Sequence, residues 1–260
     1  MSTKGEALRI YAMSDIHGNL EPLAHAVSTI NLDNPSTRLV LLGDYCDRGP
    51  DSLGVFQYIM DLQNRYGDRV IALRGNHEEM FLEYIDEADD PNFARGWMLA
   101  DSNMATTKSL LGPEDFKHAK HLVSLRKFED AYAFVVESIT SRHADIVAWV
   151  RALPYYYESP FKQVFVHAGI DEEAGDLWKI GTPQEWFTEM PPEYAGQKFY
   201  LDVISGHITT ETVSAIPNYR GIWHDGASHY YIDGNVTKYG ELAILEYDSA
   251  TGAYTGPGLG

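Results

Sequence analysis

The sequence predicts an α/β fold that takes on α+β character toward its C-terminus and carries a helical insert. Three short apolar runs at residues 8–13, 38–42 and 69–73 each end in a polar cluster, and helix-like stretches at residues 21–30 and 52–65 separate them. This alternation is typical of a βαβαβ unit. A mainly helical pattern then runs from about residue 78 to 157, after which strand-like runs resume.

The helical part of the chain is expected to form a cap over the sheet. Its periodicity is clearest at residues 128–138 and 144–153, and the pairs Asp90-Pro91 and Gly112-Pro113 interrupt it. We therefore expect a cap insert at about residues 78–157, within a single domain that spans residues 1–260.

The last third of the chain is rich in strand signals. Apolar runs occur at residues 163–166, 199–205, 229–233 and 242–247. Few residues remain for helices between the last three runs, so we expect an antiparallel half there. The residues after Asp248 are rich in Gly and Thr, and we expect them to be loosely held.

Composition indicates a folded protein of a reducing compartment. Hydrophobic residues make up 44% of the 260, which is enough for a sizeable core. No apolar run reaches the length of a membrane helix, and no apolar signal segment precedes the first strand. The single cysteine, Cys46, excludes an internal disulfide. We expect a cytoplasmic protein with no membrane partner.

The formal net charge of −18 bears on the partners of the chain. Nucleic-acid binding needs Lys and Arg along the phosphates, so we expect no nucleic-acid partner. The acidity alone can serve solubility. An acidic protein that acts on phosphate, however, must concentrate positive charge locally, and bound metal ions are one way to do so.

The first two polar clusters place acidic and basic side chains directly after apolar strands. Asp15 and His17 end the first strand, and in an extended chain they would share one face while Ile16 points into the core. Asp44, Asp47 and Arg48 follow the second strand between glycines. Charged groups at the end of a buried strand are costly without partners, so these residues are expected to bind something.

Three further strands end in the same way. The clusters are Arg74-Gly75-Asn76-His77-Glu78, His167-Ala168-Gly169 and Gly206-His207. Ligands of such sheets bind beyond the carboxyl ends of the strands. Any one cluster could be a satisfied polar residue near a turn, but five successive strand ends that each supply Asp, Asn or His point to a common site.

Together these segments resemble the signature motifs of the phosphoprotein phosphatase family of calcineurin-like metallophosphoesterases, and of its bacterial and phage-type serine/threonine phosphatases. The motifs follow one another in order, and the resemblance extends from residue 15 to about residue 247. It implies a central β-sandwich flanked by helices, with two metal ions at the strand ends and phosphomonoester hydrolysis as the activity.

The resemblance also assigns metal ligands. Asp15 and His17 would bind the first ion, Asp44 would bridge both ions, and the second ion would be held by Asn76, His167 and His207. Oxygen and nitrogen ligands of this kind suit Mn²⁺, Fe or Zn²⁺, and the resemblance favours Mn²⁺. Two divalent ions against two carboxylates and a hydroxide leave a local charge of about +1, which attracts a phosphate dianion.

A catalytic role is implied for two further residues. A hydroxide that bridges the ions would attack phosphorus, and His77 would protonate the leaving alkoxide while Asp47 orients His77 and keeps it protonated. Arg48 offers a fork that fits two phosphate oxygens. The competing interpretation of Asp47 and Arg48 is an ion pair with each other.

The remaining substrate contacts are less tightly specified by the motifs. Arg74 is expected either to touch substrate or to brace the loop around Glu78. The family usually has an arginine soon after a tryptophan that follows the His-Ala-Gly strand, and Lys179 is the only cation there in this chain. Lysine is a point charge and not a fork, so Arg142 or Arg220 are alternatives for the second clamp.

Three functions share such a metal centre. The first is a protein serine/threonine phosphatase, with phosphotyrosine as a further target, whose partner is a phosphorylated protein or peptide. The second is a symmetrical bis(5'-nucleosyl)-tetraphosphatase, which typically has Asp in place of Glu78 and often lacks the counterpart of Asp47. The third is a non-enzymatic scaffold, which the intact set of ligands and His77 disfavours. Asp47 and Glu78 favour the phosphatase.

Overall fold

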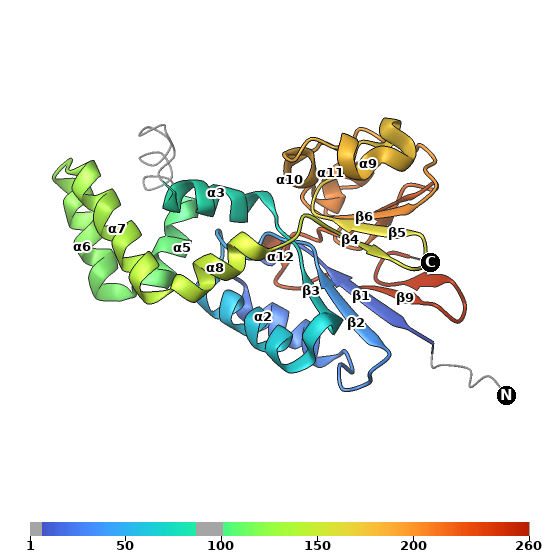
Figure 1. Cartoon of the computed structure of the whole chain (residues 1–260), viewed down its shortest axis with the longest axis horizontal. Helices are drawn as coiled ribbons and strands as arrows, with labels where there is room; N and C mark the ends of the chain where they lie inside the picture. The colour runs from blue at the N-terminus through green and yellow to red at the C-terminus, as the bar shows by residue number, and fades with distance from the viewer. Residues whose placement is uncertain (1–6, 87–100, 260) are drawn as a thin grey trace.

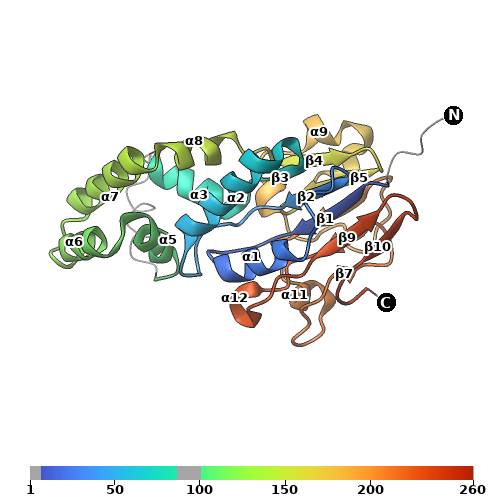
Figure 2. The same ribbon diagram turned by 90° about the horizontal axis from the view of Figure 1, so that it is seen from below.

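The computed structural model describes residues 7–86 and 101–259, and it places two mixed five-stranded sheets face to face (Figures 1 and 2). The strand order is β10-β9-β1-β2-β3 in the first sheet and β4-β5-β6-β8-β7 in the second. Helices cover the outer faces of both sheets. The predicted α/β class and the sandwich flanked by helices are confirmed.

The N-terminal βαβαβ unit is also confirmed. Its elements are β1 (Arg9–Met13), α1 (Leu20–Ser28), β2 (Thr37–Leu41), α2 (Ser52–Tyr66), the short 3-10 turn η1 (Gly67–Arg69) and β3 (Val70–Ala72). β2 pairs in parallel with both β1 and β3. The carboxyl ends of the three strands therefore lie at one edge of the sheet, as the polar clusters required.

Alternation along the strands determines which side chains meet. Ile10 and Val40 point from the first sheet into the core between the sheets, where they join Phe165 and Ile204 of the second sheet. The opposite face of the first sheet, with Leu39, packs against helices. Strands that are covered on both faces need apolar residues on both, which explains their continuous apolar runs. Each buried aliphatic side chain contributes about 1.5–3 kcal/mol.

The helical insert lies between β3 and β4. It contains α3 (Asn76–Ile85), α5 (Asp101–Leu111), α6 (Pro113–Ser124), α7 (Phe128–Arg142) and α8 (Ala144–Ala152). Gly112 has a φ of 75° and Pro113 follows it as the first residue of α6, so this pair produces the turn that the sequence predicted. The other predicted break, at residues 89–91, lies outside the described residues. Figure 1 shows α6 and α7 extending away from the sheets.

The C-terminal part alternates strands with short helices. In order, its elements are β4 (Tyr156–Ser159), β5 (Gln163–Val166), η2 (Glu172–Leu177), α9 (Trp178–Gly181), α10 (Trp186–Glu189), β6 (Asp202–Ser205), α11 (Thr210–Ser214), β7 (Trp223–His224), β8 (His229–Tyr231), α12 (Val236–Tyr239), β9 (Leu245–Asp248) and β10 (Ala253–Thr255). Trp178 and Phe187 pack on the outer face of the second sheet.

The expected antiparallel half is largely wrong. β6 pairs in parallel with β5 and with β8, because the chain between β6 and β8 includes the five-residue helix α11 and strand β7 and so crosses over before β8 begins. A helix of that length leaves little periodicity in the sequence. β9 does run antiparallel, but its partners are β1 and β10 in the first sheet.

The expectation of a loosely held tail is also wrong. β10 forms a hairpin with β9 through a turn at Gly252, whose φ is 69°. The Tyr254 hydroxyl donates to Asp202 at 2.6 Å and accepts from Gln163 at 2.7 Å. Both partners belong to the second sheet, so Tyr254 ties the two sheets together at the end away from the polar clusters.

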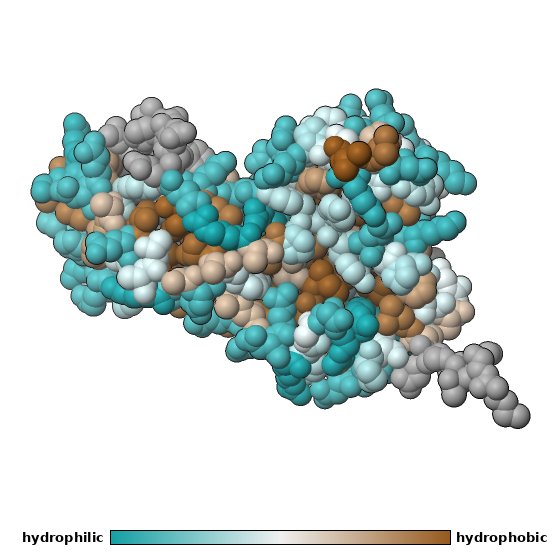
Figure 3. All heavy atoms as spheres, in the orientation of Figure 1, coloured by the Kyte–Doolittle hydropathy of each residue, from teal (hydrophilic) through white to brown (hydrophobic). Residues whose placement is uncertain are grey.

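The surface of the face seen in Figure 3 is mostly polar. Apolar side chains are visible near α9, where Leu177 at the end of η2 and Ile180 in α9 remain exposed, and also across the middle of this face. Among the described residues, no helix combines the length and the apolarity that a membrane crossing requires.

Candidate metal centre

The carboxyl ends of five strands meet where the two sheets come together. The loops after β1, β2 and β3 approach those after β5 and β6 from the other sheet. His167 donates through Nδ1 to the carbonyl of Leu42 at 2.8 Å. The backbone N–H of His207 donates to Asp15 Oδ2 at 3.0 Å. These two bonds close the site across the sheets.

All six predicted metal ligands lie in this site, and Asp44 is at its centre. Asp44 Oδ2 is 3.6 Å from His17 Nε2, and Asp44 Oδ1 is 3.4 Å from His167 Nε2. Asn76 Oδ1 lies 3.1 Å from His167 Nε2 and 3.2 Å from His207 Nδ1. The two carboxylate oxygens of Asp44 thus face two different groups of ligands, as a bridging ligand would.

The state of the histidines fits a metal site. His17 donates through Nδ1 to the carbonyl of Cys46 at 2.9 Å, and its buried Nε2 has no hydrogen-bond partner. His167 is oriented in the same way by Leu42. A backbone carbonyl on one ring nitrogen fixes the tautomer that leaves the other nitrogen with a free lone pair. Burial lowers the pKa of His17 to about 3 and that of His207 to about 4, so both favour the neutral form that binds metal.

The carboxylates of the site also fit bound cations. Burial, together with the neighbouring charges of Asp15 and Glu78, raises the pKa of Asp44 well above its usual value. Asp233, which the sequence analysis did not single out as a site residue, is buried beside the site, and its pKa is raised by burial and then by Asp15. Closely spaced buried carboxylates repel one another, and a divalent ion removes that repulsion. The donors present therefore fit divalent metal ions.

The backbone of the site is left-handed at several ligands, which corrects one expectation. Asp15 and His17 have φ values of 56° and 46°, so the chain turns here and does not continue as a strand. Ile16 is fully buried, as expected, but the two ligands converge because of the turn and not through strand alternation. Asp44, Asp47, Arg48 and His207 also have positive φ values. Such residues are uncommon and persist only where the surroundings hold them.

Two glycines of the motifs are required for close approach. A Cβ on Gly75 would collide with the carboxylate and backbone of Asp44, and a Cβ on Gly206 would collide with Ser14 and the Asp15 carboxylate. Both positions lie where one site loop passes directly over another. Glycine therefore serves here to let the loops pack, and not to provide flexibility.

The Glu78 carboxylate holds two of these loops together. It is fully buried, and it accepts from the N–H groups of Asp44 and Tyr45, each at 2.8 Å, and of Gly75 at 3.0 Å. A buried carboxylate with several N–H donors is satisfied without a cation. The sequence motif contained Glu78 but did not reveal this bracing role.

Next to Asp44 lies the pair of residues with the predicted catalytic role. His77 Nδ1 is 2.7 Å from Asp47 Oδ2, and His77 Nε2 is 3.8 Å from Asp44 Oδ2. Burial by itself would lower the pKa of His77, but the Asp44 and Asp47 carboxylates outweigh it and raise that pKa. Arg48 Nη2 lies 3.4 Å from His77 Nε2. No ion pair joins Asp47 to Arg48 in the part of the chain that the structure describes.

Arg74 joins the loop after β3 to the end of α8. Its Nη2 donates to the carbonyls of Val150 and Arg151 at the end of α8, and its Nη1 donates to Glu79 and Tyr155. A guanidinium held by four acceptors has little capacity left for phosphate. These contacts favour the bracing alternative, and a substrate contact of Arg74 stays a prediction.

The second phosphate clamp is not found at Lys179. Lys179 forms a surface ion pair with Glu158 of β4, and Glu158 lies opposite Val164 in the strand register. His167 follows three residues later, about 10 Å along the strand. The two alternatives are also engaged elsewhere, since Arg142 pairs with Asp115 and Arg220 with Glu241.

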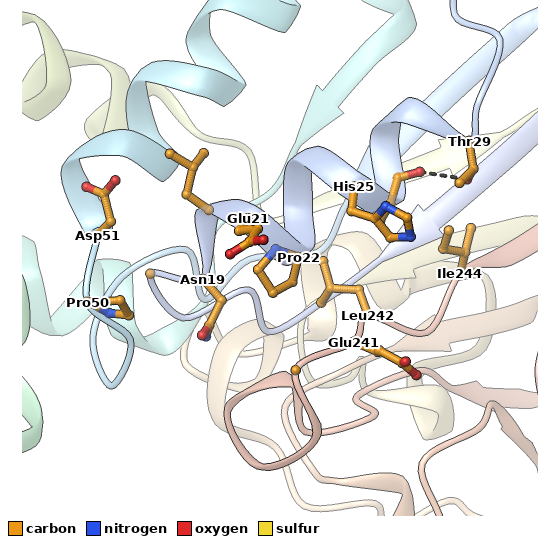
Figure 4. A pocket seen from close by; sticks show the side chains of 14 residues that line it. Asn19, Glu21, Pro22, His25, Thr29, Pro50, Asp51, Glu241, Leu242 and Ile244 are labelled. Carbon is orange, nitrogen blue, oxygen red and sulfur yellow. Dashed lines mark hydrogen bonds between the residues drawn. The ribbon is translucent and has the colours of Figure 1, made fainter.

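A groove of about 980 Å³ begins beside the site and runs along α1 (Figure 4). Pro50 and Asp51 lie at one end in Figure 4, and Thr29 and Ile244 lie at the other. Gly18, which follows His17, also lines the groove. Glu21, Asp51 and Glu241 supply its charges. Among the described residues that line the groove, none is a Lys or an Arg.

Of the histidines outside the motifs, His229 is held in a charged cluster. Its Nδ1 lies 2.5 Å from Asp225 Oδ2 and its Nε2 lies 2.6 Å from Glu172 Oε1. Both ring nitrogens face carboxylates that only accept, so the ring satisfies both bonds as an imidazolium. Burial lowers the pKa of His229, but Glu172 and Asp225 outweigh it and raise it above 6.5.

Known proteins resemble this chain in sequence and in fold. Residues 8–244 match the family model described as calcineurin-like phosphoesterase. A symmetrical bis(5'-nucleosyl)-tetraphosphatase of Thioalkalivibrio sulfidiphilus is 37% identical over 71 residues, which cover 27% of this chain and 25% of that protein. The serine/threonine-protein phosphatase ppe1 of Schizosaccharomyces pombe is 42% identical over 64 residues, covering 25% and 21%. The matched segments thus span a quarter or less of these relatives.

Solved structures support the fold over the whole chain. The structure of a candidate diadenosine tetraphosphatase superposes with a TM-score of 0.57 at 16% identity, covering 99% of this chain and 96% of the other. At this level of identity the likeness concerns the fold alone.

Replacement of the central carboxylate tests the metal centre. We expect Asp44→Asn to bind substantially less divalent metal than the wild type, because one bridging carboxylate would serve both ions. His77→Asn is the matched control, since it removes a neighbouring ring that is not a predicted ligand. Elemental analysis after dialysis against Mn²⁺ measures both. Equal metal content in Asp44→Asn and wild type would contradict the assignment.

The His229 cluster predicts a stability that depends on pH. The pKa of His229 is raised on folding, so its contribution is complete below the unfolded value of 6.5 and is lost as the pH rises through the folded value. We expect the wild type to exceed His229→Gln in unfolding free energy most at low pH. This difference should shrink as the pH rises through the pKa of His229 in the folded protein. Urea unfolding at several pH values measures it, and a constant difference would exclude an imidazolium.

Proposed function

Because the chain belongs to the calcineurin-like phosphoesterase family and is therefore a hydrolase, we propose that it removes phosphate from phosphoserine and phosphothreonine, and also from phosphotyrosine, in proteins or peptides. The observation that carries this proposal is the Asp47–His77 pair, which lies 2.7 Å apart beside the shared carboxylate of Asp44. It supplies the proton donor that a phosphomonoester with an alkoxide leaving group needs.

We propose two divalent ions as cofactors, most suitably Mn²⁺, with Fe or Zn²⁺ as alternatives for the same oxygen and nitrogen donors. Asp15, His17 and Asp44 would hold one ion, and the other would be held by Asp44, Asn76, His167 and His207. When bound, the ions would supply a hydroxide nucleophile at neutral pH and stabilise the charge on the phosphoryl oxygens.

His77 is suited to donate a proton from Nε2. Its Nδ1–H is held by Asp47, which orients the ring and favours the imidazolium over the neutral form. Nε2 is thereby turned toward the centre, near Asp44 and Arg48. A leaving alkoxide at that position would take the Nε2 proton, and the charge of Asp47 would stabilise the ring before the transfer.

Arg48 is the cation placed to bind the phosphate. Its Nη2 lies 3.4 Å from His77 Nε2, at the edge of the centre, and its charge disfavours protonation of His17 and His207. Arg48 and protonated His77 both donate, and a phosphate oxygen between them could accept from both. In neutral His77, Nε2 can accept from Arg48 Nη2 at 3.4 Å, and when His77 is protonated the phosphate oxygen would take the place of that acceptor.

The alternative, a symmetrical bis(5'-nucleosyl)-tetraphosphatase, is supported by the relative from Thioalkalivibrio sulfidiphilus. Two observations favour the phosphoprotein. Asp47 is fully buried and bonded to His77, whereas the dinucleotide enzymes often lack this aspartate. The groove beside the site carries Glu21, Asp51 and Glu241 without a Lys or Arg among its described lining residues. A chain of four phosphates would be repelled there, and an apolar or basic peptide segment would not.

The proposal also covers the compartment, the partners and the role of the helical insert. A single buried thiol, Cys46, suits a reducing compartment, and we propose the cytoplasm. The net charge of −18 disfavours nucleic acid as a partner. The helices between β3 and β4 would act as the cap of a single domain and present substrate to the centre.

His77→Asn tests the proton donor. We expect the variant to lose activity on a phosphoserine peptide by about 10²–10⁴-fold, the usual contribution of general acid–base catalysis. Its metal content should equal that of the wild type. Steady-state kinetics with Mn²⁺ and elemental analysis measure the two quantities. Near-normal turnover of the phosphopeptide would show that His77 is not the acid.

The substrate class is tested by a paired assay with Mn²⁺. A panel of phosphoserine, phosphothreonine and phosphotyrosine peptides is compared with diadenosine tetraphosphate at equal concentrations. We expect a higher kcat/KM on at least one phosphopeptide, because the site offers one secure phosphate clamp and an acidic groove. Preferential release of ADP from the dinucleotide would contradict the phosphoprotein proposal and identify the dinucleotide as the substrate.

A further inference from the structure

Thr106 belongs to helix α5 of the insert, yet its hydroxyl lies against the loop that follows β2. The side chain is fully buried. Thr106 Oγ1 is 2.5 Å from Asp47 Oδ1 and 2.8 Å from the backbone nitrogen of Asp47. A carboxylate can only accept and an amide N–H can only donate, so the hydroxyl gives its proton to Oδ1 and accepts from the N–H.

Ser52, the first residue of α2, completes this arrangement. Ser52 Oγ is 3.0 Å from Thr106 Oγ1 and is itself fully buried. Because the single proton of Thr106 is already donated to Asp47, Ser52 must donate to Thr106. The Thr106 hydroxyl then makes one donated and two accepted bonds, which is its full capacity. A satisfied network in a buried, low-dielectric environment is stiff, and removal of one member is costly.

The Asp47 carboxylate is therefore held from two sides. Oδ1 accepts from Thr106, and Oδ2 lies 2.7 Å from His77 Nδ1. Rotation of the carboxylate would break both bonds at once. The position of the His77 ring consequently depends on a hydroxyl that comes from another part of the chain.

Helix α5 is in turn fixed to the start of α2. The backbone N–H of Leu53 donates to Ser109 Oγ at 2.9 Å. Ser109 lies three residues after Thr106, so both hydroxyls project from the same face of α5. This face thus carries one residue that holds the helix in place and one that touches the proton-donor pair.

We propose that Thr106 is a positioning residue through which helix α5 of the insert holds Asp47, and thereby His77, in the geometry for proton donation. The inference rests on the proposed function, because it assumes that His77 protonates the leaving group. It means that the Thr106 hydroxyl reaches the chemical step through two consecutive hydrogen bonds, one to Asp47 and one between Asp47 and His77.

The test compares two substrates that differ in their need for a proton. A phosphoserine peptide releases an alkoxide, whereas p-nitrophenyl phosphate releases a phenolate that leaves unprotonated. We expect Thr106→Val to lower kcat on the phosphopeptide about tenfold, with KM and the rate on p-nitrophenyl phosphate within about twofold. Thr106→Ser keeps the hydroxyl and should retain wild-type kinetics on both substrates.

Ser109→Ala is the matched control on the same helix face. It removes the bonds to Leu53 and Asp51 but none to Asp47, so it should lower thermal stability without changing the ratio of the two rates. A second readout needs no turnover. The His77 Nδ1 proton resonance, assigned by its loss in His77→Asn, should shift in Thr106→Val and remain in place in Thr106→Ser and Ser109→Ala.

The outcomes separate the inference from the function on which it rests. Equal losses on both substrates in Thr106→Val, or the same selective loss in Ser109→Ala, would overturn the inference. So would an unchanged His77 resonance in Thr106→Val. Selective loss in His77→Asn without selective loss in Thr106→Val would overturn the inference and leave the proposed function intact. A wild-type protein that is inactive on phosphopeptides but active on p-nitrophenyl phosphate would overturn both.

Discussion

A buried carboxylate must be surrounded by groups that compensate its charge, and the placement of Asp44 shows how much of this protein is arranged to do so. The loop that carries Asp44 passes directly over Gly75, where a side chain would displace the carboxylate. The Glu78 carboxylate holds the backbone N–H groups on both sides of this crossing. His17 and His167 then approach the two oxygens of Asp44 from different sheets. The sandwich thus brings side chains from both sheets to the two carboxylate oxygens of Asp44.

The centre is proposed to bind an anion, although the molecule as a whole is strongly negative. The chain carries a net charge of −18, and the groove that Gly18 and Pro50 line is acidic as well. In the part of the chain that the structure describes, Arg48 is the cation with a contact to a site residue, through His77. Long-range attraction cannot therefore guide an anion to this protein, and binding has to depend on short-range contacts within the site.

Sequence reasoning reached the fold class and the polar clusters that the structure brings together, because both are local. The apolar runs and the polar clusters that follow them are contiguous, and parallel strands bring such clusters to one edge. The strand direction after β6 was not predictable, because α11 and β7 are too short to leave a pattern. The β9–β10 hairpin was obscured by its glycine-rich turn. In both cases tertiary pairing decides what the local sequence leaves open.

Side-chain roles were predictable only where a motif names both partners. Asp47 and His77 belong to two motifs and were correctly paired. Arg74 sits within a motif, but its acceptors on α8 come from a distant segment, so its bracing role was one alternative of two. Thr106 lies in the helical insert without any motif, and only the packing of α5 against α2 reveals it. Residues that act from a distant helix leave no trace in a single sequence.

The left-handed backbone at Asp15, His17, Asp44 and His207 restricts which residue types these positions can accept. Aspartate, asparagine and histidine tolerate that conformation better than most residues, and they are also good ligands for divalent cations. Glutamate or cysteine would satisfy the chemistry of some metals but would meet the wrong backbone. A change of metal preference is thus expected to come from substitutions of the residues around the ligands and not of the ligands themselves. Related proteins with different metal preferences would then share the same donors and differ in the residues packed behind them.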